Sequence, residues 1–154
     1  MNYWLLKSEP GTFSIDDLAA QPGKMSSWDG VRNYQARNML RDCMKQGDKA
    51  FFYHSSCEIP GIAGIVRIVK NGYPDKTAFD RKHHHYDPDS KPDAPRWYVV
   101  DVKLERKFKH IITLDELRRH ASDELSDFVV LRRGNRLSVT PVTQAEWDFI
   151  LTLE

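Results

Sequence analysis

Five stretches rich in aromatic and β-branched residues predict β-strands, and their arrangement restricts the fold more than any other feature of the chain. They cover residues 3–7, 50–55, 62–69, 97–104 and 137–142. Helix signals fall between some of these strands, without the regular strand–helix–strand alternation that a parallel α/β sheet requires. The sequence therefore predicts an α+β fold with a curled mixed β-sheet or a small β-barrel, flanked by helices.

The length of the chain indicates one compact unit. A chain of 154 residues can bury roughly 70% of the surface that its unfolded form exposes, and no internal repeat or linker interrupts it. We therefore expect residues 1–154 to form a single domain. No apolar run reaches the ~18 residues of a membrane span, and the N-terminus lacks a secretory pattern. We expect a cytoplasmic protein, or a nuclear one in a eukaryote, with no membrane partner.

The two cysteines point to the same compartments. Cys43 and Cys57 form no CxxC pair and are too few for a disulfide framework, which suits a reducing environment. A free cysteine commonly behaves as a small core hydrophobe, so we expect both side chains to have a structural role.

Helix starts are marked by hydroxyl side chains that precede an acidic residue by three positions. The pairs are Ser14 with Asp17, Thr113 with Glu116, and Thr143 with Glu146. A further helix of about a dozen residues is predicted by apolar side chains at helical spacing. These apolar positions are Ala36, Met39, Leu40, Cys43 and Met44. Residues 70–96 carry few aliphatic side chains and are expected to form a long exposed connection.

The charge balance argues against a general polyanion binder. Lys and Arg number 23 against 22 Asp and Glu, so the formal net charge is only +1. Non-specific duplex binding depends on neutralising many phosphates. A nucleic-acid function would therefore need a specific pocket beside a local basic patch, and basic residues do cluster at residues 32–41 and 132–136.

The segment around Trp28 carries the most chemical information. An aromatic residue in a turn-rich loop is followed at once by a helix start with Arg32 and Arg37. Backbone N–H groups at a helix start attract anions such as phosphate, and arginine adds charge and paired donors. Trp28 would supply a stacking face, although it could equally fill the core. Trp97, at a predicted strand start, could form the opposite wall of a slot.

Other candidate chemistry is weaker. Trp4 and Trp147 are best explained as core residues. His54 and Ser55 suggest a hydrolase, but no motif places a nucleophile on a strained turn. His54 and Cys57, three residues apart on a strand, would point to opposite faces.

The histidine triplet, residues 83–85, does not have the spacing of a zinc site. It suggests a solvated loop. We therefore expect no catalytic residues, metal or cofactor.

Several strings, in this order along the chain, together resemble the EVE domain family. They are Trp4-Leu5-Leu6-Lys7-Ser8-Glu9-Pro10, Trp28-Asp29-Gly30-Val31-Arg32-Asn33-Tyr34-Gln35-Ala36-Arg37-Asn38, Tyr53-His54-Ser55, Gly61-Ile62-Ala63-Gly64, Tyr73-Pro74-Asp75, Pro95-Arg96-Trp97 and Arg136-Leu137-Ser138-Val139-Thr140-Pro141-Val142. The resemblance runs from about residue 2 to residue 152. It implies a PUA-like fold, a curled mixed β-barrel flanked by helices and related to YTH and ASCH domains.

The resemblance also implies a function. EVE domains are regarded as readers of modified cytosine or adenine in DNA or RNA, which hold one base in a pocket. Carried over by position, the pocket residues are Lys7, Ser8, Trp28, Asn33, Tyr34, His54, Ser55 and Trp97. The residues expected to meet the nucleic-acid backbone are Arg32, Arg37, Arg133 and Ser138.

Three interpretations remain open on these residues. The first is a non-catalytic module that binds a nucleic acid with a modified base, in which Ser8, Asn33 and His54 distinguish one base edge from another. The second is an enzyme acting on a modified nucleoside or nucleic acid, and the third is a protein-interaction module using residues 70–96. The sequence leaves the oligomeric state open.

Overall fold

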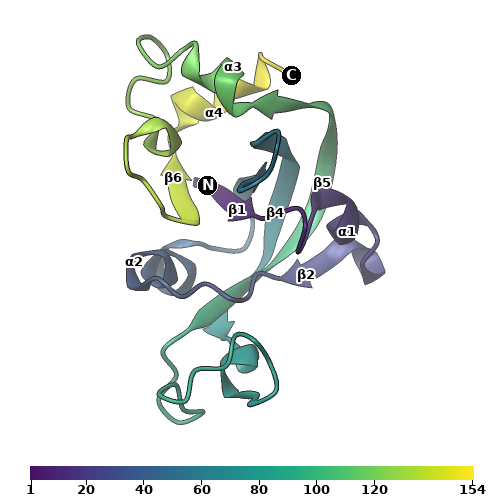
Figure 1. Ribbon diagram of the computed structural model, residues 1–154, viewed down its shortest axis with the longest axis vertical. Helices are drawn as coiled ribbons and strands as arrows, with labels where there is room; N and C mark the ends of the chain where they lie inside the picture. The colour runs from purple at the N-terminus through teal and green to yellow at the C-terminus, as the bar shows by residue number, and fades with distance from the viewer.

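The computed structural model describes residues 1–154 and contains one six-stranded sheet (Figure 1). The strands are β1 (Tyr3–Ser8), β2 (Met25–Ser27), β3 (Lys49–His54), β4 (Gly61–Pro74), β5 (Tyr98–Thr113) and β6 (Val139–Val142). Their order in the sheet is β2-β5-β4-β3-β1-β6. The sheet is mixed, because β1 pairs with β3 in parallel and every other pairing is antiparallel.

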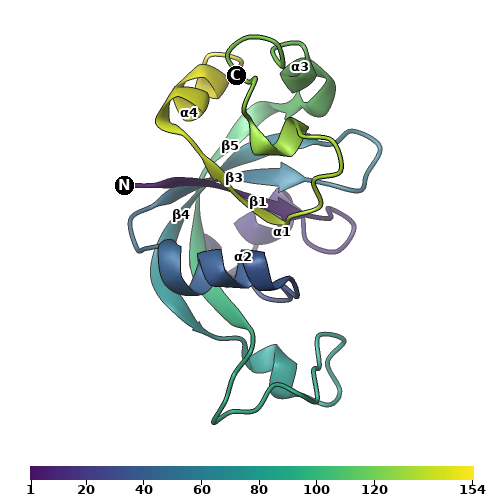
Figure 2. The same cartoon turned by 90° about the vertical axis from the view of Figure 1, so that its left-hand side faces the viewer.

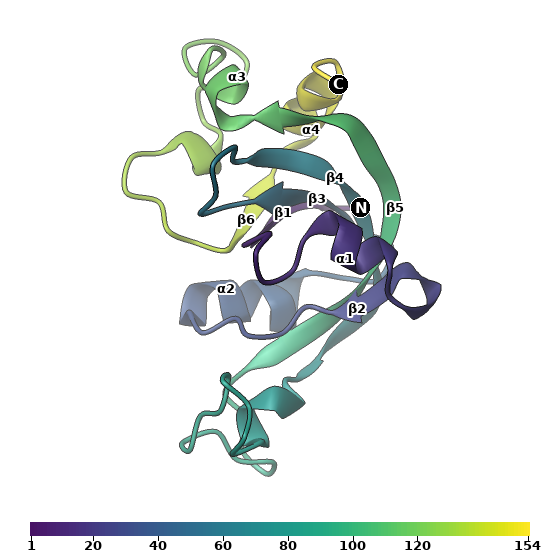
Figure 3. The same ribbon diagram turned by 45° about the vertical axis from the view of Figure 1, so that its right-hand side comes forward.

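The sheet is curled but does not close. Its edge strands β2 and β6 do not pair with each other, and the register of β4 against β5 shifts at several irregularities. Such irregularities bend a strand and increase its twist. Figure 3 shows the resulting curl. The predicted α+β class is therefore confirmed, with an open curled sheet in place of a hydrogen-bonded barrel.

Short helices flank this sheet. They are α1 (Ile15–Ala19), α2 (Tyr34–Asn38), α3 (Leu114–Arg118) and α4 (Gln144–Leu151), with 3₁₀ turns at Pro22–Lys24, Lys76–Phe79 and Val129–Leu131. The predicted caps are confirmed: Ser14 and Thr143 form complete capping boxes, and Thr113 accepts a hydrogen bond from the Glu116 N–H. Figure 2 shows α2 crossing the middle of the molecule, with α3 and α4 at one end. No helix is long and apolar enough to cross a membrane.

Alternation along β1 divides the interior into two clusters. Trp4 and Leu6 lie in one cluster with Trp28, while Leu5 lies in the other with Trp147. Side chains of successive strand residues point to opposite faces, so one strand supplies both clusters. The prediction that Trp4 and Trp147 are core residues is confirmed.

The helix after Val31 corrects one prediction. Beyond α2 the chain continues as a π-helical segment, Met39–Cys43, in which the Met44 N–H donates to the Met39 carbonyl. The wider π turn alters the angular spacing of side chains, so Ala36, Leu40 and Met44 are buried while Cys43 is exposed. Cys57 is only partly buried. The expectation that the cysteines fill the core is therefore wrong for Cys43.

The segment predicted as one long connection is more structured than expected. β4 continues to Pro74, and β5 begins at Tyr98, so the two strands extend beyond the rest of the sheet as a two-stranded arm (Figure 1). The tip loop, residues 75–97, joins them. Within it Ala78 and Ser90 are buried. The tip loop is therefore packed against the protein, and it contributes to the site described next.

Candidate nucleic-acid interface

A cavity of about 290 Å³ opens between β1, β2 and the tip loop. Its lining residues are Lys7, Ser8, Thr12, Phe13, Ser26, Ser27, Trp28, Asp29, His83, His84 and His85. Three of the eight predicted pocket residues, Lys7, Ser8 and Trp28, line this cavity. The other lining residues were not predicted. Five of them, Thr12, Phe13, Ser26, Ser27 and Asp29, are neighbours of Ser8 or Trp28 along the chain or in the loop after β1, and the three histidines come from the tip loop, which only the tertiary fold brings beside β2.

Trp28 forms part of the cavity lining and of the core at the same time. Its side chain is 6% exposed, and its ring meets Phe52 edge-on at 5.3 Å and Phe13 at 6.4 Å between centroids. Its backbone N–H donates to the carbonyl of Val100 at 2.8 Å. The two interpretations of Trp28 from the sequence are thus combined: the core holds the indole rigidly where it lines the cavity.

The end of β1 supplies polar groups to the cavity. The Ser8 hydroxyl donates to the Phe13 carbonyl at 2.6 Å, which fixes the loop that follows the strand. Burial lowers the pKa of Lys7, and its ammonium lies 5.9 Å from the centre of the Tyr53 ring. Lys7 also lines two neighbouring grooves, so it stands where three hollows of the surface meet.

The tip loop is fixed in place by Asp75 and Arg32. Asp75 is 1% exposed and accepts hydrogen bonds from the Gly30 N–H and from Arg32, each at 3.0 Å. Burial alone would raise the pKa of Asp75, but hydrogen bonds from Thr77, Gly30 and Arg32 outweigh burial and lower it. Arg32 also donates to the carbonyl of His85 at 2.7 Å. Arg32 is therefore engaged within the protein, where the sequence predicted a contact to nucleic-acid backbone.

Trp97 does not line this cavity, and the two indoles are not facing walls of one slot. The Trp97 ring stacks on Tyr34 with centroids 4.8 Å apart, and its Nε1–H donates to Asp87 at 2.6 Å. The Arg32 guanidinium lies 5.4 Å from the same ring. The prediction that Trp97 and Tyr34 line the base pocket therefore differs from the structure, because Trp97 lies where the tip loop meets β5 and packs there against Tyr34.

Asn33 and His54 support the surrounding backbone. The Asn33 side chain caps α2 by accepting from the Ala36 N–H. His54 Nε2 accepts from the Ile15 N–H at 3.1 Å, and burial lowers the pKa of its imidazole. The structure thus places these two polar side chains beside helix starts. Because its Nε2 is occupied, His54 has no free lone pair with which to activate a hydroxyl or thiol.

The predicted backbone contacts fall into two groups. Arg133 and Ser138 line neighbouring grooves of about 530 and 400 Å³ that share Lys7 with the cavity. Ser55, predicted as a pocket residue, lines these two grooves and not the cavity. Arg132 and Arg136 are exposed beside them and form no salt bridge. Arg37, by contrast, donates to the carbonyl of Arg96 at 2.7 Å and stands over the Tyr34 ring. A basic surface therefore continues from the cavity through Lys7 to the segment around Arg133.

Comparison with known proteins identifies the family of the chain. The family model described as the EVE domain matches residues 2–153. Thymocyte nuclear protein 1 of Mus musculus is 51% identical over 168 residues, which covers 99% of this chain and 74% of that protein.

Solved structures are similar over the same extent. The crystal structure of human THYN1 protein in complex with 5-methylcytosine-containing DNA gives a TM-score of 0.93 at 49% identity, covering 99% of this chain and 97% of that one. The crystal structure of a Pseudomonas putida protein gives a TM-score of 0.92 at 47% identity, covering 98% of both chains.

Proposed function

The chain belongs to the EVE domain family, and from this we propose that it binds nucleic acid without catalysis, by holding one modified cytosine or adenine in the cavity beside Trp28. The observation that carries the proposal is the cavity itself. Its volume of about 290 Å³ lies just below the roughly 300–1,000 Å³ of pockets that take drug-sized ligands, which suits one heterocycle. The similar human THYN1 structure is a complex with DNA that contains such a base.

Polar groups around Trp28 supply the means to select a base. Burying one methyl group contributes only about 0.8 kcal/mol, so strong discrimination requires groups that leave the wrong base edge unpaired. The Asp29 carboxylate lines the cavity, and carboxylates accept from the exocyclic amino group of cytosine. Adenine also has an exocyclic amino group, whereas thymine and uracil do not. Asp29 is therefore the side chain we assign to this selection.

Affinity must come largely from outside the cavity. Stacking on an aromatic ring contributes about 1–3 kcal/mol per base, and extruding a paired base costs a few kcal/mol, so the two nearly cancel on a duplex. The basic surface from Lys7 to Arg133 supplies the additional attraction to phosphates. A single-stranded target, or one with a weakened base pair, would bind more tightly than an intact duplex, because less free energy is spent on extruding the base.

The hydrogen bonding of His54, which lies near Ser55 and Cys57 in the sequence, supports the absence of catalysis. His54 Nε2 already accepts a backbone hydrogen bond, and a general base needs that lone pair. Incubation with oligonucleotides carrying modified bases, followed by mass analysis, should return unchanged substrate. A product formed in proportion to protein would contradict this part of the proposal.

Binding to matched oligonucleotides tests the proposal directly. Single strands that differ only in one cytosine, methylated or not, are titrated with wild type, with Asp29→Asn and with Asp123→Asn, a control at an exposed aspartate that lines neither the cavity nor the two grooves. We expect tighter binding of the modified strand by wild type, a loss with Asp29→Asn and no change with Asp123→Asn. Equal affinity for both strands and for all three proteins would overturn the proposal.

A further inference from the structure

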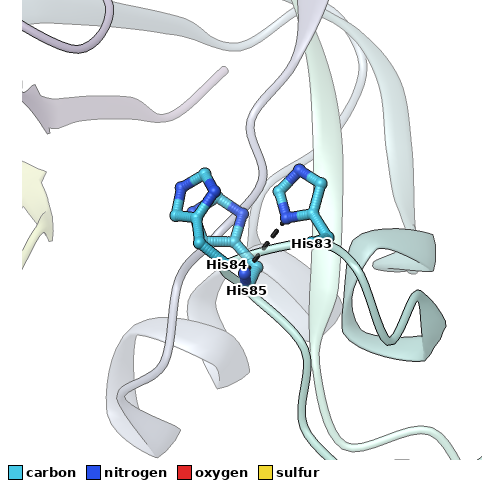
Figure 4. Close-up of side chains that lie close together, drawn as sticks. All are labelled: His83, His84 and His85. Atoms are coloured by element: carbon cyan, nitrogen blue, oxygen red, sulfur yellow. Dashed lines mark hydrogen bonds between the residues drawn. The ribbon is translucent and has the colours of Figure 1, made fainter.

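The histidine triplet forms a cluster whose chemistry the proposed function does not use. One nitrogen ligand atom from each of His83, His84 and His85 lies within 4.8 Å of the other two. The ring centroids are 4.0 to 4.7 Å apart. Figure 4 shows the three rings on the same side of the loop. In an extended segment neighbouring side chains would point in opposite directions, so the backbone conformation is what gathers them.

Two consecutive turns produce this gathering. The His83 N–H donates to the Asp80 carbonyl, and the Tyr86 N–H donates to the His83 carbonyl, each at 3.0 Å. Contacts from outside the triplet then hold the backbone, including the bond from Arg32 to the His85 carbonyl at 2.7 Å. The backbone beneath the rings is therefore fixed before any ligand binds. The spacing argument against a metal, made from the sequence, does not apply to a turn of this kind.

We infer that the histidine triplet is a site for one divalent transition-metal ion that prefers imidazole, represented by Zn²⁺. Neutral imidazole suits Zn²⁺, Cu²⁺ and Ni²⁺ better than Mg²⁺ or Ca²⁺. Zinc bound at about 2.0–2.1 Å holds tetrahedral ligand atoms about 3.3 Å apart. Nitrogens that already lie within 4.8 Å reach this spacing by ring rotation, and His84 is exposed and free to turn.

A negative charge lies beside the triplet. Asp29 Oδ1 lies 3.9 Å from His85 Nδ1, and Asp29 lines the same cavity as the three histidines, so its carboxylate attracts a cation there. A water molecule commonly completes a zinc site with three protein ligands, and it leaves the Asp29 carboxylate to the exocyclic amino group of the base. The ion would stand in the wall of the cavity.

Metal binding changes the hydrogen bonds of two rings. His85 Nδ1 lies 3.4 Å from Thr77 Oγ1, and this contact is given up if Nδ1 becomes the ligand. His83 Nδ1 accepts from the His85 N–H at 3.0 Å (Figure 4), so in the metal-free neutral ring the other nitrogen carries the hydrogen. When His83 becomes a ligand, either Nδ1 turns from the amide to the ion or the ring changes tautomer and releases the amide. In both cases the His85 N–H loses its acceptor.

Calorimetric titration with Zn²⁺ alone tests the site, and since it contains no nucleic acid its result is independent of the proposed function. Four samples are compared: wild type, His84→Asn, the control His110→Asn at an exposed histidine elsewhere, and a synthetic peptide of residues 80–89. We expect one ion per wild-type chain, bound at least about tenfold more tightly than by the peptide because the turn is preorganised. His84→Asn should lose about tenfold or more, and His110→Asn should match wild type.

A spectroscopic measurement locates the ion. Because the His85 N–H gives up its acceptor on binding, its amide resonance should move on addition of one equivalent of Zn²⁺. Wild-type affinity no greater than that of the peptide, an unchanged affinity in His84→Asn, or binding that leaves the His85 amide unmoved would each overturn the inference.

Discussion

Substitution of Gly30 by alanine should disturb the cavity through one defined contact. Gly30 has a φ of +78°, and a Cβ built there would lie 2.5 Å from both Cε1 and Nε2 of His85. Two costs follow. A residue with a side chain loses roughly 1–2 kcal/mol in the left-handed conformation, and the imidazole that lines the cavity has to move.

A second glycine separates these costs. Gly47 also has a positive φ, +96°, but a Cβ there would meet nothing within 4 Å. Gly47→Ala therefore has the backbone cost alone, and it lies outside the cavity. For a protein of this size 1 kcal/mol corresponds to a Tm shift of about 2–4 °C, so Gly47→Ala should melt about 2–8 °C below wild type and Gly30→Ala lower still. Only Gly30→Ala should bind the modified oligonucleotide more weakly.

Thermal melts and fluorescence anisotropy on the two variants, each with and without His85→Ala, complete the assay. The three atoms nearest to the new methyl group all belong to the imidazole, so the extra destabilisation of Gly30→Ala over Gly47→Ala should shrink strongly in the His85→Ala background. Such a difference between backgrounds is a coupling energy between neighbours. The reasoning is refuted if the two glycine variants bind the oligonucleotide equally well, or if His85→Ala leaves their difference in stability unchanged.

Three further substitutions test other parts of the structure. Asp75→Asn should cost about 1–3 kcal/mol at neutral pH, since it weakens charge-assisted hydrogen bonds to a buried group. The pKa of Asp75 in the folded protein lies below its ordinary 3.8, so the stability that its carboxylate contributes is present above pH 3.8 and is lost as the pH falls through the folded pKa. The difference in Tm between wild type and Asp75→Asn should therefore narrow in acid. A constant difference would contradict the role of the Asp75 carboxylate in holding the tip loop. Arg133→Ala should weaken binding of all oligonucleotides alike and reduce the slope of log affinity against log salt by about 1, measured between low and physiological salt. An unchanged slope would remove Arg133 from the backbone contacts. Tyr34→Ala should cost about 0.5–1.5 kcal/mol of stacking in urea unfolding, with base selectivity retained; loss of selectivity would return Tyr34 to the pocket.

The sequence by itself determined where five of the six strands lie and where three helices begin, but it missed β2 and the far ends of β4 and β5. Caps such as Ser14 and Thr143 act within one turn of a helix, and the alternation along residues 3–7 depends only on strand geometry, so both are readable without the fold. The family followed from strings spread along the chain. Local chemistry of this kind also identified Lys7, Ser8 and Trp28, which the structure brings together in one cavity.

Only the tertiary structure decided which side chains face one another. Trp97 finds Tyr34 across more than sixty positions of the chain, and residues 83–85 reach the cavity because Asp75 and Arg32 hold the tip loop there. Neither contact produces a periodic pattern in the sequence, since each depends on where the two-stranded arm of β4 and β5 places the tip loop. The physical reason is that capping and alternation are set by neighbours within about one turn, whereas the walls of a cavity are set by long-range packing.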